Sequence, residues 1–194
     1  MTAARGTPQD GARSGSRFVA LLRGVNVGGR NAISMADLAA SFRDAGYDDV
    51  STYLQSGNVL FTARRRTGAA LETELEAMLE QRFGIPLLVV VRSRDELAAT
   101  IDAAPPDHGS SKLRSEVIFL KRPLTAADAL AEFPDLRDGV DSVTPGPGAI
   151  YFSRVAARAT KTRIQLVMAM PICRQMTMRT WRTCTALLDK LDAS

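Results

Sequence analysis

The order in which short apolar strands and amphipathic helices alternate is the feature that most constrains how this chain can fold. In chain order, the first half contains a strand at 18–22, a helix at 35–42, two strands at 50–54 and 58–61, a helix at 71–79 and a strand at 87–91. Ser34 stands where a helix cap is needed, with Asp37 three residues later, and Gly46 and Gly84 stand where the two helices should end. This order is typical of a split βαβ, or ferredoxin-like, unit with an antiparallel sheet.

The same order begins again after a loop rich in Pro, Gly and Ser at 104–111. The second half predicts a strand at 117–120, a helix at 125–133, paired strands at 140–143 and 150–152, a helix at 160–168 and a last helix at 181–191. We therefore expect an α+β chain of two ferredoxin-like units with mainly antiparallel sheets. The expected divisions are a disordered tail (1–16), a first unit with a connecting helix (17–104) and a second unit (105–194).

Composition excludes several classes of protein. The 194 residues are 45% hydrophobic and 24% charged, with 14 Gly and 2 Cys, which fits a globular chain without disulfide staples. The apolar runs are far shorter than the roughly 20 residues that cross a bilayer. The first 16 residues lack the apolar region of a secretory signal, and the two cysteines suit reduced thiols. We expect a cytoplasmic protein that does not bind a membrane; the sequence leaves its oligomeric state open.

Charge is distributed unevenly along the chain. Residues 95–152 hold 10 acidic and 5 basic side chains, whereas residues 153–194 hold 8 basic and 2 acidic ones. Of the 25 basic residues, 21 are Arg, whose forked guanidinium suits carboxylate and phosphate. This excess indicates either an anion-binding surface or only a bias in genomic base composition.

A glycine-rich loop follows the first predicted strand and precedes the first predicted helix. It consists of Arg23, Gly24, Val25, Asn26, Val27, Gly28, Gly29, Arg30 and Asn31. Glycines let a backbone approach a ligand, and the start of a helix favours an anion. A nucleotide-triphosphatase loop would have Lys in place of Arg30 and Ser or Thr in place of Asn31, and it belongs to parallel sheets. The loop therefore indicates a simpler anion site, with a tight structural connection as the alternative.

A second polar loop, around Ser56 and Gly57, joins the strands at 50–54 and 58–61. In a ferredoxin-like sheet the strand at 18–22 lies beside the strand at 58–61 and antiparallel to it, so we expect the two loops to form one rim. The predicted ligand-binding residues are Arg23, Gly24, Asn26, Gly28, Gly29, Arg30, Asn31, Ser56 and Asn58. For Ser56 and Asn58 the alternative is bonding to their own turn.

Neither loop contains His, Cys, Asp or Glu, so no conventional base, nucleophile or metal set stands there. We expect no metal and no cofactor. The single histidine, His108, is interpreted as a solvent-exposed loop residue.

A third segment, residues 177–183, leads into the last helix and includes Arg179, Trp181 and Arg182, with Arg154 and other basic residues upstream. Arg beside Trp could hold a phosphate at a helix start or stack on a ring. The simpler interpretation makes Thr180 or Thr177 the helix cap and Trp181 a core anchor.

These three segments, 23–31, 52–61 and 177–183, resemble the signature segments of the bacterial family called domain of unknown function 1697. The resemblance covers residues 17–192 and implies two ferredoxin-like units, but no established activity. This chain departs from the usual pattern at Arg30 (typically Lys), Thr160 (typically Ser), Thr180 (typically Asn) and Ala186 (typically Lys). The departures favour the first two loops as a shared site over the C-terminal segment.

Three function classes follow from the sequence. The favoured one is a binding module for a phosphorylated small molecule or nucleotide at the glycine-rich loop. A metal-independent enzyme that uses Tyr53 or Lys161 as acid or base is an alternative. A nucleic-acid binder is less favoured, because an RNA-recognition sheet would show stacking aromatics and the strands offer only Phe18 and Phe61.

Overall fold

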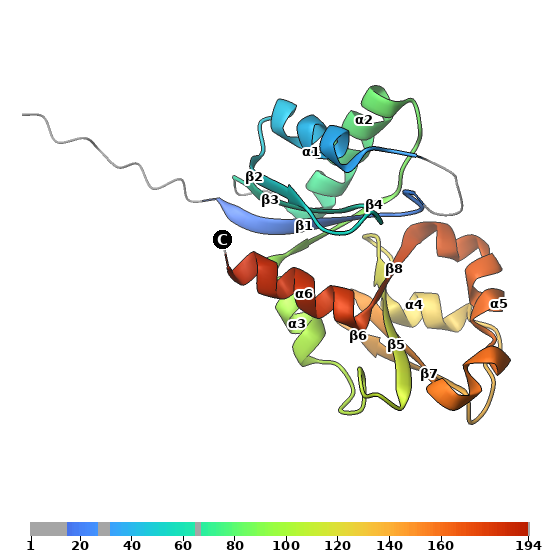
Figure 1. Cartoon of the computed structure of the whole chain (residues 1–194). Helices are drawn as coiled ribbons and strands as arrows, with labels where there is room; N and C mark the ends of the chain where they lie inside the picture. Colours follow the sequence, from blue (N-terminus) through green and yellow to red (C-terminus); the bar gives the residue numbers. More distant parts are fainter. Residues whose placement is uncertain (1–14, 27–31, 65–66, 194) are drawn as a thin grey trace, which may run out of the picture.

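The computed structural model describes residues 15–26, 32–64 and 67–193. The strands are β1 (Ser16–Leu22), β2 (Asp48–Thr52), β3 (Asn58–Ala63), β4 (Val89–Ser93), β5 (Leu113–Leu120), β6 (Asp141–Gly146), β7 (Ala149–Val155) and β8 (Met176–Thr180). The α-helices are α1 (Met35–Asp44), α2 (Gly68–Phe83), α3 (Arg94–Asp102), α4 (Ala126–Ala131), α5 (Ile164–Ala169) and α6 (Trp181–Asp192), with 3₁₀ turns η1 (Ala156–Lys161) and η2 (Pro171–Gln175). Figure 1 shows their arrangement.

The first unit, β1 to β4 with α1 and α2, has the antiparallel strand order β2-β3-β1-β4. Ser34 caps α1 by accepting a hydrogen bond from the Asp37 backbone N–H, as the sequence predicts. Phe18 and Phe61 stack with ring centroids 5.7 Å apart on the sheet face that α1 and α2 cover. Alternating side chains of β1 and β3 thus bury one face of the sheet under two helices.

The second unit, β5 to β8 with α4 and α5, repeats this topology with the order β6-β7-β5-β8. Its helix-side core contains Ile118, Ile150 and Phe152, packed against α4, α5 and η2. The fold class predicted from the sequence is therefore confirmed: two ferredoxin-like units with antiparallel sheets.

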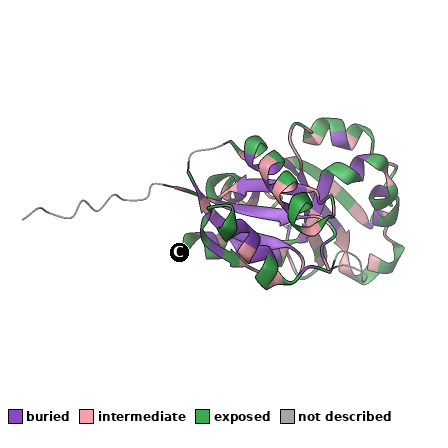
Figure 2. Ribbon diagram, turned by 90° about the horizontal axis from the view of Figure 1, so that it is seen from above, coloured by how far each residue is buried: buried purple, intermediate pink, exposed green. Residues whose placement is uncertain are grey.

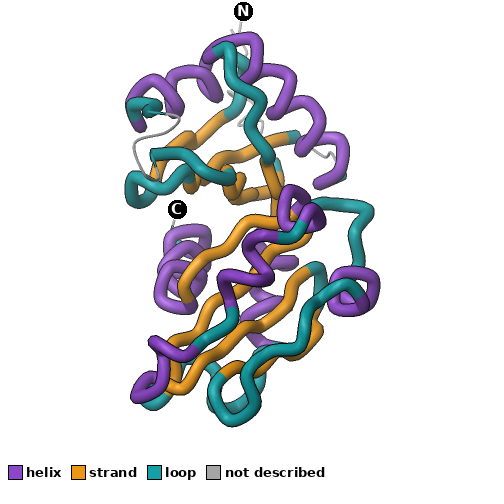
Figure 3. Tube along the Cα trace, turned by 90° about the vertical axis from the view of Figure 1, so that its right-hand side faces the viewer, coloured by secondary structure: helices purple, strands orange, loops and turns teal. Residues whose placement is uncertain are grey.

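The two sheets face one another across a shared core. Val19, Leu21 and Leu60 of the first sheet belong to the same buried cluster as Val117 and Phe119 of the second. Helices α3 and α6 lie between the sheets and contribute Leu97 and Leu187, among others, to this cluster (Figure 1). The inner strands β1, β3, β5 and β7, together with β4, are mostly buried on both faces (Figure 2), whereas the edge strands β2 and β6 are largely exposed. Figure 3 shows the first unit above the second. A continuous apolar interface of this kind holds the units together.

Three local predictions are wrong. Residues 176–180 form the edge strand β8, which pairs with β5, and are not merely a lead into the last helix. This strand was missed because its inward-facing Thr177 and Arg179 are polar and contact polar groups of the first unit. The helix expected at 160–168 is divided into η1 and α5. Ser16 belongs to β1, where it pairs with Ala63, and not to the tail.

Candidate functional site

The two polar loops meet at one edge of the first sheet, as the sequence predicts. The Leu22 backbone N–H donates to the Gly57 carbonyl at 2.8 Å, and β1 runs antiparallel to β3. The register places Leu21 opposite Asn58. Gly57 has φ +72°, and a Cβ there would lie 2.9 Å from the Leu22 Cβ, so the close approach of the loops requires glycine.

Asn26 ties the first loop to the second. Its Nδ2 donates to the carbonyls of Ile33 (2.9 Å) and Gln55 (3.0 Å), and its Oδ1 accepts from the Ile33 N–H at 2.9 Å. The residue adopts φ +55°, a conformation that Asn tolerates better than most residues. Asn26 thus uses its amide group to close the loop.

Asn58 and Arg23 are also engaged within the protein. Asn58 is fully buried and donates to the Tyr53 carbonyl (2.8 Å) and to Ser56 Oγ (3.2 Å), which is the turn bonding that competes with a ligand role. Arg23 reaches the second unit and donates to the carbonyls of Cys173 and Met176, the latter at 2.8 Å. These side chains therefore hold loops and units in place.

Arg179 of β8 completes this arrangement from the second unit. Its guanidinium donates to Asn58 Oδ1 (2.5 Å) and to the carbonyls of Leu22 (2.8 Å), Ser56 (3.0 Å) and Gly57 (3.2 Å). It also donates to its own strand, at Thr177 Oγ1 and the Met178 carbonyl. We call Arg179 with Leu22, Ser56, Gly57 and Asn58 the Arg179 joint. Burial lowers the pKa of Arg179 to about 10, so it stays charged at neutral pH.

Through Arg179, the segment 177–183 therefore contacts the two polar loops. This differs from the expectation that its departures from the family pattern separate it from a site shared by the first two segments. Of the predicted ligand-binding residues, Arg23, Gly24, Asn26, Ser56 and Asn58 lie around the joint. Gly28, Gly29, Arg30 and Asn31 lie outside the described residues. A ligand role for this rim stays a prediction, and its described side-chain amides and guanidinium bind protein groups.

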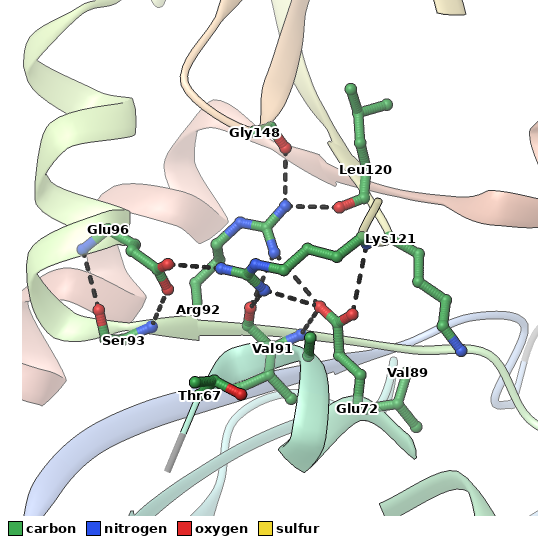
Figure 4. A network of polar contacts seen from close by, with 12 residues as sticks. Thr67, Glu72, Val89, Val91, Arg92, Ser93, Glu96, Leu120, Lys121 and Gly148 are labelled. Atoms are coloured by element: carbon green, nitrogen blue, oxygen red, sulfur yellow. Dashed lines mark hydrogen bonds and ion pairs between the residues drawn. The ribbon is translucent and has the colours of Figure 1, made fainter. Parts of the chain in front are cut away.

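A second arginine crosses the interface on β4. Arg92 is 2% exposed, and its guanidinium donates to the carbonyls of Leu120 (2.6 Å) and Gly148 (2.7 Å) in the second unit and to Val91 in its own strand (Figure 4). Glu72 of α2 lies 3.5 Å from the same guanidinium. Burial, and after it the nearby Arg122, lowers the pKa of Arg92 to about 10, against the opposing effect of Glu72 and Glu96.

Glu72 joins this network from below (Figure 4). It accepts from the Val91 N–H at 3.0 Å and from the Arg122 guanidinium at 2.9 Å. Burial raises the pKa of Glu72, while the Val91 N–H and the two arginines act in the opposite direction. The interface is thus fixed at two places by buried arginines that bind backbone carbonyls of the other unit.

A different arginine cluster surrounds a pocket of about 400 Å³ at the start of α6, within the second unit. We call it the α6 pocket; its lining consists of Gly109, Leu113, Arg114, Ser115, Glu116, Arg154, Thr180, Trp181 and Arg182. Thr180 caps α6 by accepting from the Thr183 N–H, so the cap predicted from the sequence is confirmed. Arg114 and Arg182 are exposed, and neither guanidinium bonds to any residue in the described part of the chain. The pocket therefore presents uncommitted donors at a helix start.

Glu116 is the acidic member of the pocket. Its Oε1 accepts from Arg154 at 2.8 Å, whereas its buried Oε2 has no hydrogen-bond partner among the residues that the structure describes. Burial raises the pKa of Glu116, and Arg154 and Arg114 oppose that shift. A buried carboxyl oxygen without a partner is uncommon and favours a ligand that supplies a donor.

His108 lies behind this pocket and is buried, so its interpretation as a solvent-exposed residue is wrong. Its ring meets the Trp181 ring edge to face, with centroids 4.8 Å apart, and its Nδ1 lies 3.0 Å from Ser153 Oγ. Gly109, next to it, adopts φ +86° and packs against the Trp181 ring. Desolvation lowers the pKa of His108. The flanking Pro, Asp and Gly gave no sign of burial, because the apolar partners come from β7 and α6.

A larger groove of about 750 Å³ lies between the starts of α2 and α3 and the end of α6. Its guanidiniums are already engaged within the protein. Arg94 pairs with Asp192 and Asp95, Arg122 pairs with Glu72 and Glu96, and Arg17 donates to the carbonyls of Leu191 and Lys190. It holds no comparable set of uncommitted donors among its described lining residues.

The proposed acid or base residues of the enzyme alternative lie apart. Tyr53 follows β2, and its ring lies 5.0 Å from Lys190 Nζ of α6, while Lys161 ends η1 in the second unit. Within the described ranges, no helix is long and apolar enough to cross a membrane and no group of three His, Cys, Asp or Glu side chains could hold a metal ion.

Comparison with known proteins identifies the family. The family model described as "Protein of unknown function (DUF1697)" matches residues 16–151. The chain belongs to this family. The match ends in β7, so Arg179 and the start of α6 fall outside it.

Similarity to a solved structure supports the fold and indicates no activity. The chain is similar to the conserved bacterial protein SP0830 from Streptococcus pneumoniae, with a TM-score of 0.81 and 23% identity. The similarity covers 92% of this chain and 99% of that one. At this identity it shows the fold alone. No curated protein matches the sequence.

Proposed function

We propose that this DUF1697 protein binds a phosphorylated small molecule in the α6 pocket. The observation that carries the proposal is the cluster of Arg114, Arg154 and Arg182 around a helix start, beside a buried Glu116 oxygen that lacks a partner in the described structure. Backbone N–H groups and guanidiniums are the donors that phosphate prefers in proteins. A volume of about 400 Å³ suits a small organic ligand.

The pocket supports this function better than the rim at the glycine-rich loop does. At the rim, the described side chains of Arg23, Asn26 and Asn58 already bond to protein groups. A ligand there would have to displace those bonds, whereas Arg114 and Arg182 are available without rearrangement. The pocket therefore offers binding at lower cost in protein structure.

The fold disfavours the nucleic-acid alternative. RNA-recognition modules bind bases on an open sheet face that carries aromatic side chains. Here Phe18 and Phe61 lie under α1 and α2, and the opposite face of the first sheet is buried against the second unit. Neither sheet of the described structure offers the stacking platform that this class of protein uses.

Calorimetric titration against phenyl phosphate and a panel of sugar phosphates and nucleoside monophosphates tests the proposal. We expect saturable binding by the wild type, at least tenfold weaker binding by Arg182→Gln and Arg114→Gln, and unchanged binding by Arg137→Gln. Arg137 is an exposed arginine of the second unit outside the pocket, so it controls for net charge.

The same titration separates the pocket from the rim. Loss of binding in Arg30→Ala, with Arg182→Gln behaving like the wild type, would assign the ligand to the glycine-rich loop. Absence of saturable binding at millimolar concentration across the panel would contradict the proposed function.

A further inference from the structure

Glu116 gives the α6 pocket a feature that pure anion sites lack. It projects from β5, where its strand neighbours are Phe152 of β7 and Thr180 of β8, and it is 9% exposed. One carboxyl oxygen is held by Arg154, and the other has no partner in the described part of the chain. Because Glu116 lines the pocket, an oxyanion bound there would have this carboxyl group beside the guanidinium donors.

The charged groups around Glu116 come from three elements. Arg114 precedes it on β5, Arg154 faces it from β7, and Arg182 lines the pocket from α6. Desolvation opposes ionisation of the carboxyl group and raises its pKa, while Arg154 and Arg114 favour the ionised carboxylate. His108 lies behind Trp181 and bonds to Ser153, so it is not a partner of the carboxyl group.

A carboxylate and an oxyanion oxygen can share a hydrogen bond only when one proton lies between them. A phosphomonoester monoanion carries that proton itself, because its second pKa is about 6. A sulfate ester has the same shape and charge but carries no ionisable proton. It can pair with Glu116 only after the carboxyl group has taken a proton from solvent.

We propose that Glu116 makes the α6 pocket select oxyanions that carry a proton, so that phosphomonoesters bind in preference to sulfate esters. This inference rests on the proposed function and names the ligand class of the same pocket. The arginines bind either oxyanion, and Glu116 discriminates between them. The carboxyl group is thus a specificity-determining residue and not a mere counter-ion of Arg154.

The selection has a defined pH dependence. Above the pKa of Glu116, sulfate-ester binding requires uptake of a proton, so its affinity falls by up to about tenfold per pH unit. Phosphomonoester binding draws on the ligand's own proton and keeps its affinity up to about pH 6. Phosphate preference over sulfate should therefore grow as Glu116 ionises.

Phenyl phosphate and phenyl sulfate form a matched pair for the test. Calorimetry at pH 6 should show at least about fivefold tighter binding of phenyl phosphate by the wild type. In Glu116→Gln the amide N–H donates without a proton from solvent, so the two affinities should agree within about twofold. Wild-type affinity for phenyl sulfate should also fall between pH 5 and pH 7, a measurement that needs no variant.

The outcomes separate the two claims. Binding of both ligands with dependence on Arg182, but with the same affinity ratio in wild type and Glu116→Gln, would overturn the selection and leave the binding function standing. A pH-independent affinity for phenyl sulfate would also overturn it. Failure of both ligands to bind would overturn the proposed function and the selection together.

Discussion

Arg179 and Arg182 stand three residues apart in the sequence, yet they have opposite environments. Arg179 is 8% exposed, and its guanidinium donates to carbonyls of the other unit. Arg182 is exposed at the pocket, and its guanidinium bonds to no residue in the described part of the chain. The turn from β8 into α6 lies between them. Burial and local acceptors, and not residue type, separate an arginine that holds the fold from one that is available to a ligand.

Of the variants considered, we expect replacement of Arg179 to have the largest effect on the free energy of unfolding. Arg179→Met should lower the free energy of unfolding by about 3–5 kcal/mol, because the carbonyls of Leu22 and Ser56 and the Asn58 side chain would lose buried donors. Urea denaturation followed by circular dichroism measures this loss. The matched control is Arg182→Met, which should cost under about 0.5 kcal/mol. Equal losses in the two variants would remove the distinction.

The second buried arginine should show the next largest effect. Arg92→Met removes donors from the carbonyls of Leu120 and Gly148 and from Glu72, with an expected loss of about 2–3 kcal/mol. Arg94→Met provides the control, because the ion pairs of Arg94 are exposed and solvent screening leaves them little effect on stability. Urea denaturation again supplies the measurement. A loss no greater than that of Arg94→Met would show that Arg92 does not fasten the interface.

His108 predicts a smaller, pH-dependent effect next to the pocket. Burial lowers its pKa below the usual 6.5, so the folded state binds fewer protons than the unfolded state. Its stabilising contribution is complete above pH 6.5 and is lost as the pH falls toward the lowered value, by at most about 1.4 kcal/mol per pH unit. Thermal melts between pH 7.5 and 5 should show a steeper fall in the wild type than in His108→Gln. Parallel curves for the two proteins would contradict this assignment.

Substitutions of the exposed arginines of the α6 pocket should change the free energy of unfolding least. Arg114→Gln should change the free energy of unfolding by under about 0.5 kcal/mol, because its guanidinium is exposed and forms no bond within the described chain. The variant should nevertheless lose the rise in melting temperature that a saturating phosphomonoester gives the wild type. Differential scanning fluorimetry with and without phenyl phosphate checks both expectations. A full ligand shift in this variant would place the ligand elsewhere.

The fold was largely predictable because periodicity and caps act locally. Ser34 begins α1 as its capping pattern predicts, and the antiparallel pairing of β1 with β3 follows from the order of the elements. Strand β8 was not predictable in this way, since Thr177 and Arg179 are polar and buried only through contacts with a distant turn. Apolar periodicity finds strands whose partners are apolar, and it misses a strand that faces carbonyl groups.

The candidate site was less predictable than the fold. Sequence spacing brought Asn26, Ser56 and Asn58 together correctly, but it could not show that their amides bond to protein groups. No sequence pattern marked Glu116 and Arg114 as site residues. They lie near Arg154 and Arg182 only because β5 pairs with β7 and with β8, which leads into α6. Sites assembled from separate strands in this way need the register as well as the elements.

A crystal structure of the wild-type protein with phenyl phosphate, grown without sulfate or other phosphate, tests the central claim most directly. The account predicts the phosphoryl group in the α6 pocket, with its oxygens within hydrogen-bond distance of Arg154 and Arg182 and one of them bonded to Glu116 Oε2. Density for the ligand at the glycine-rich loop, with an empty α6 pocket and Arg182 unchanged, would contradict it.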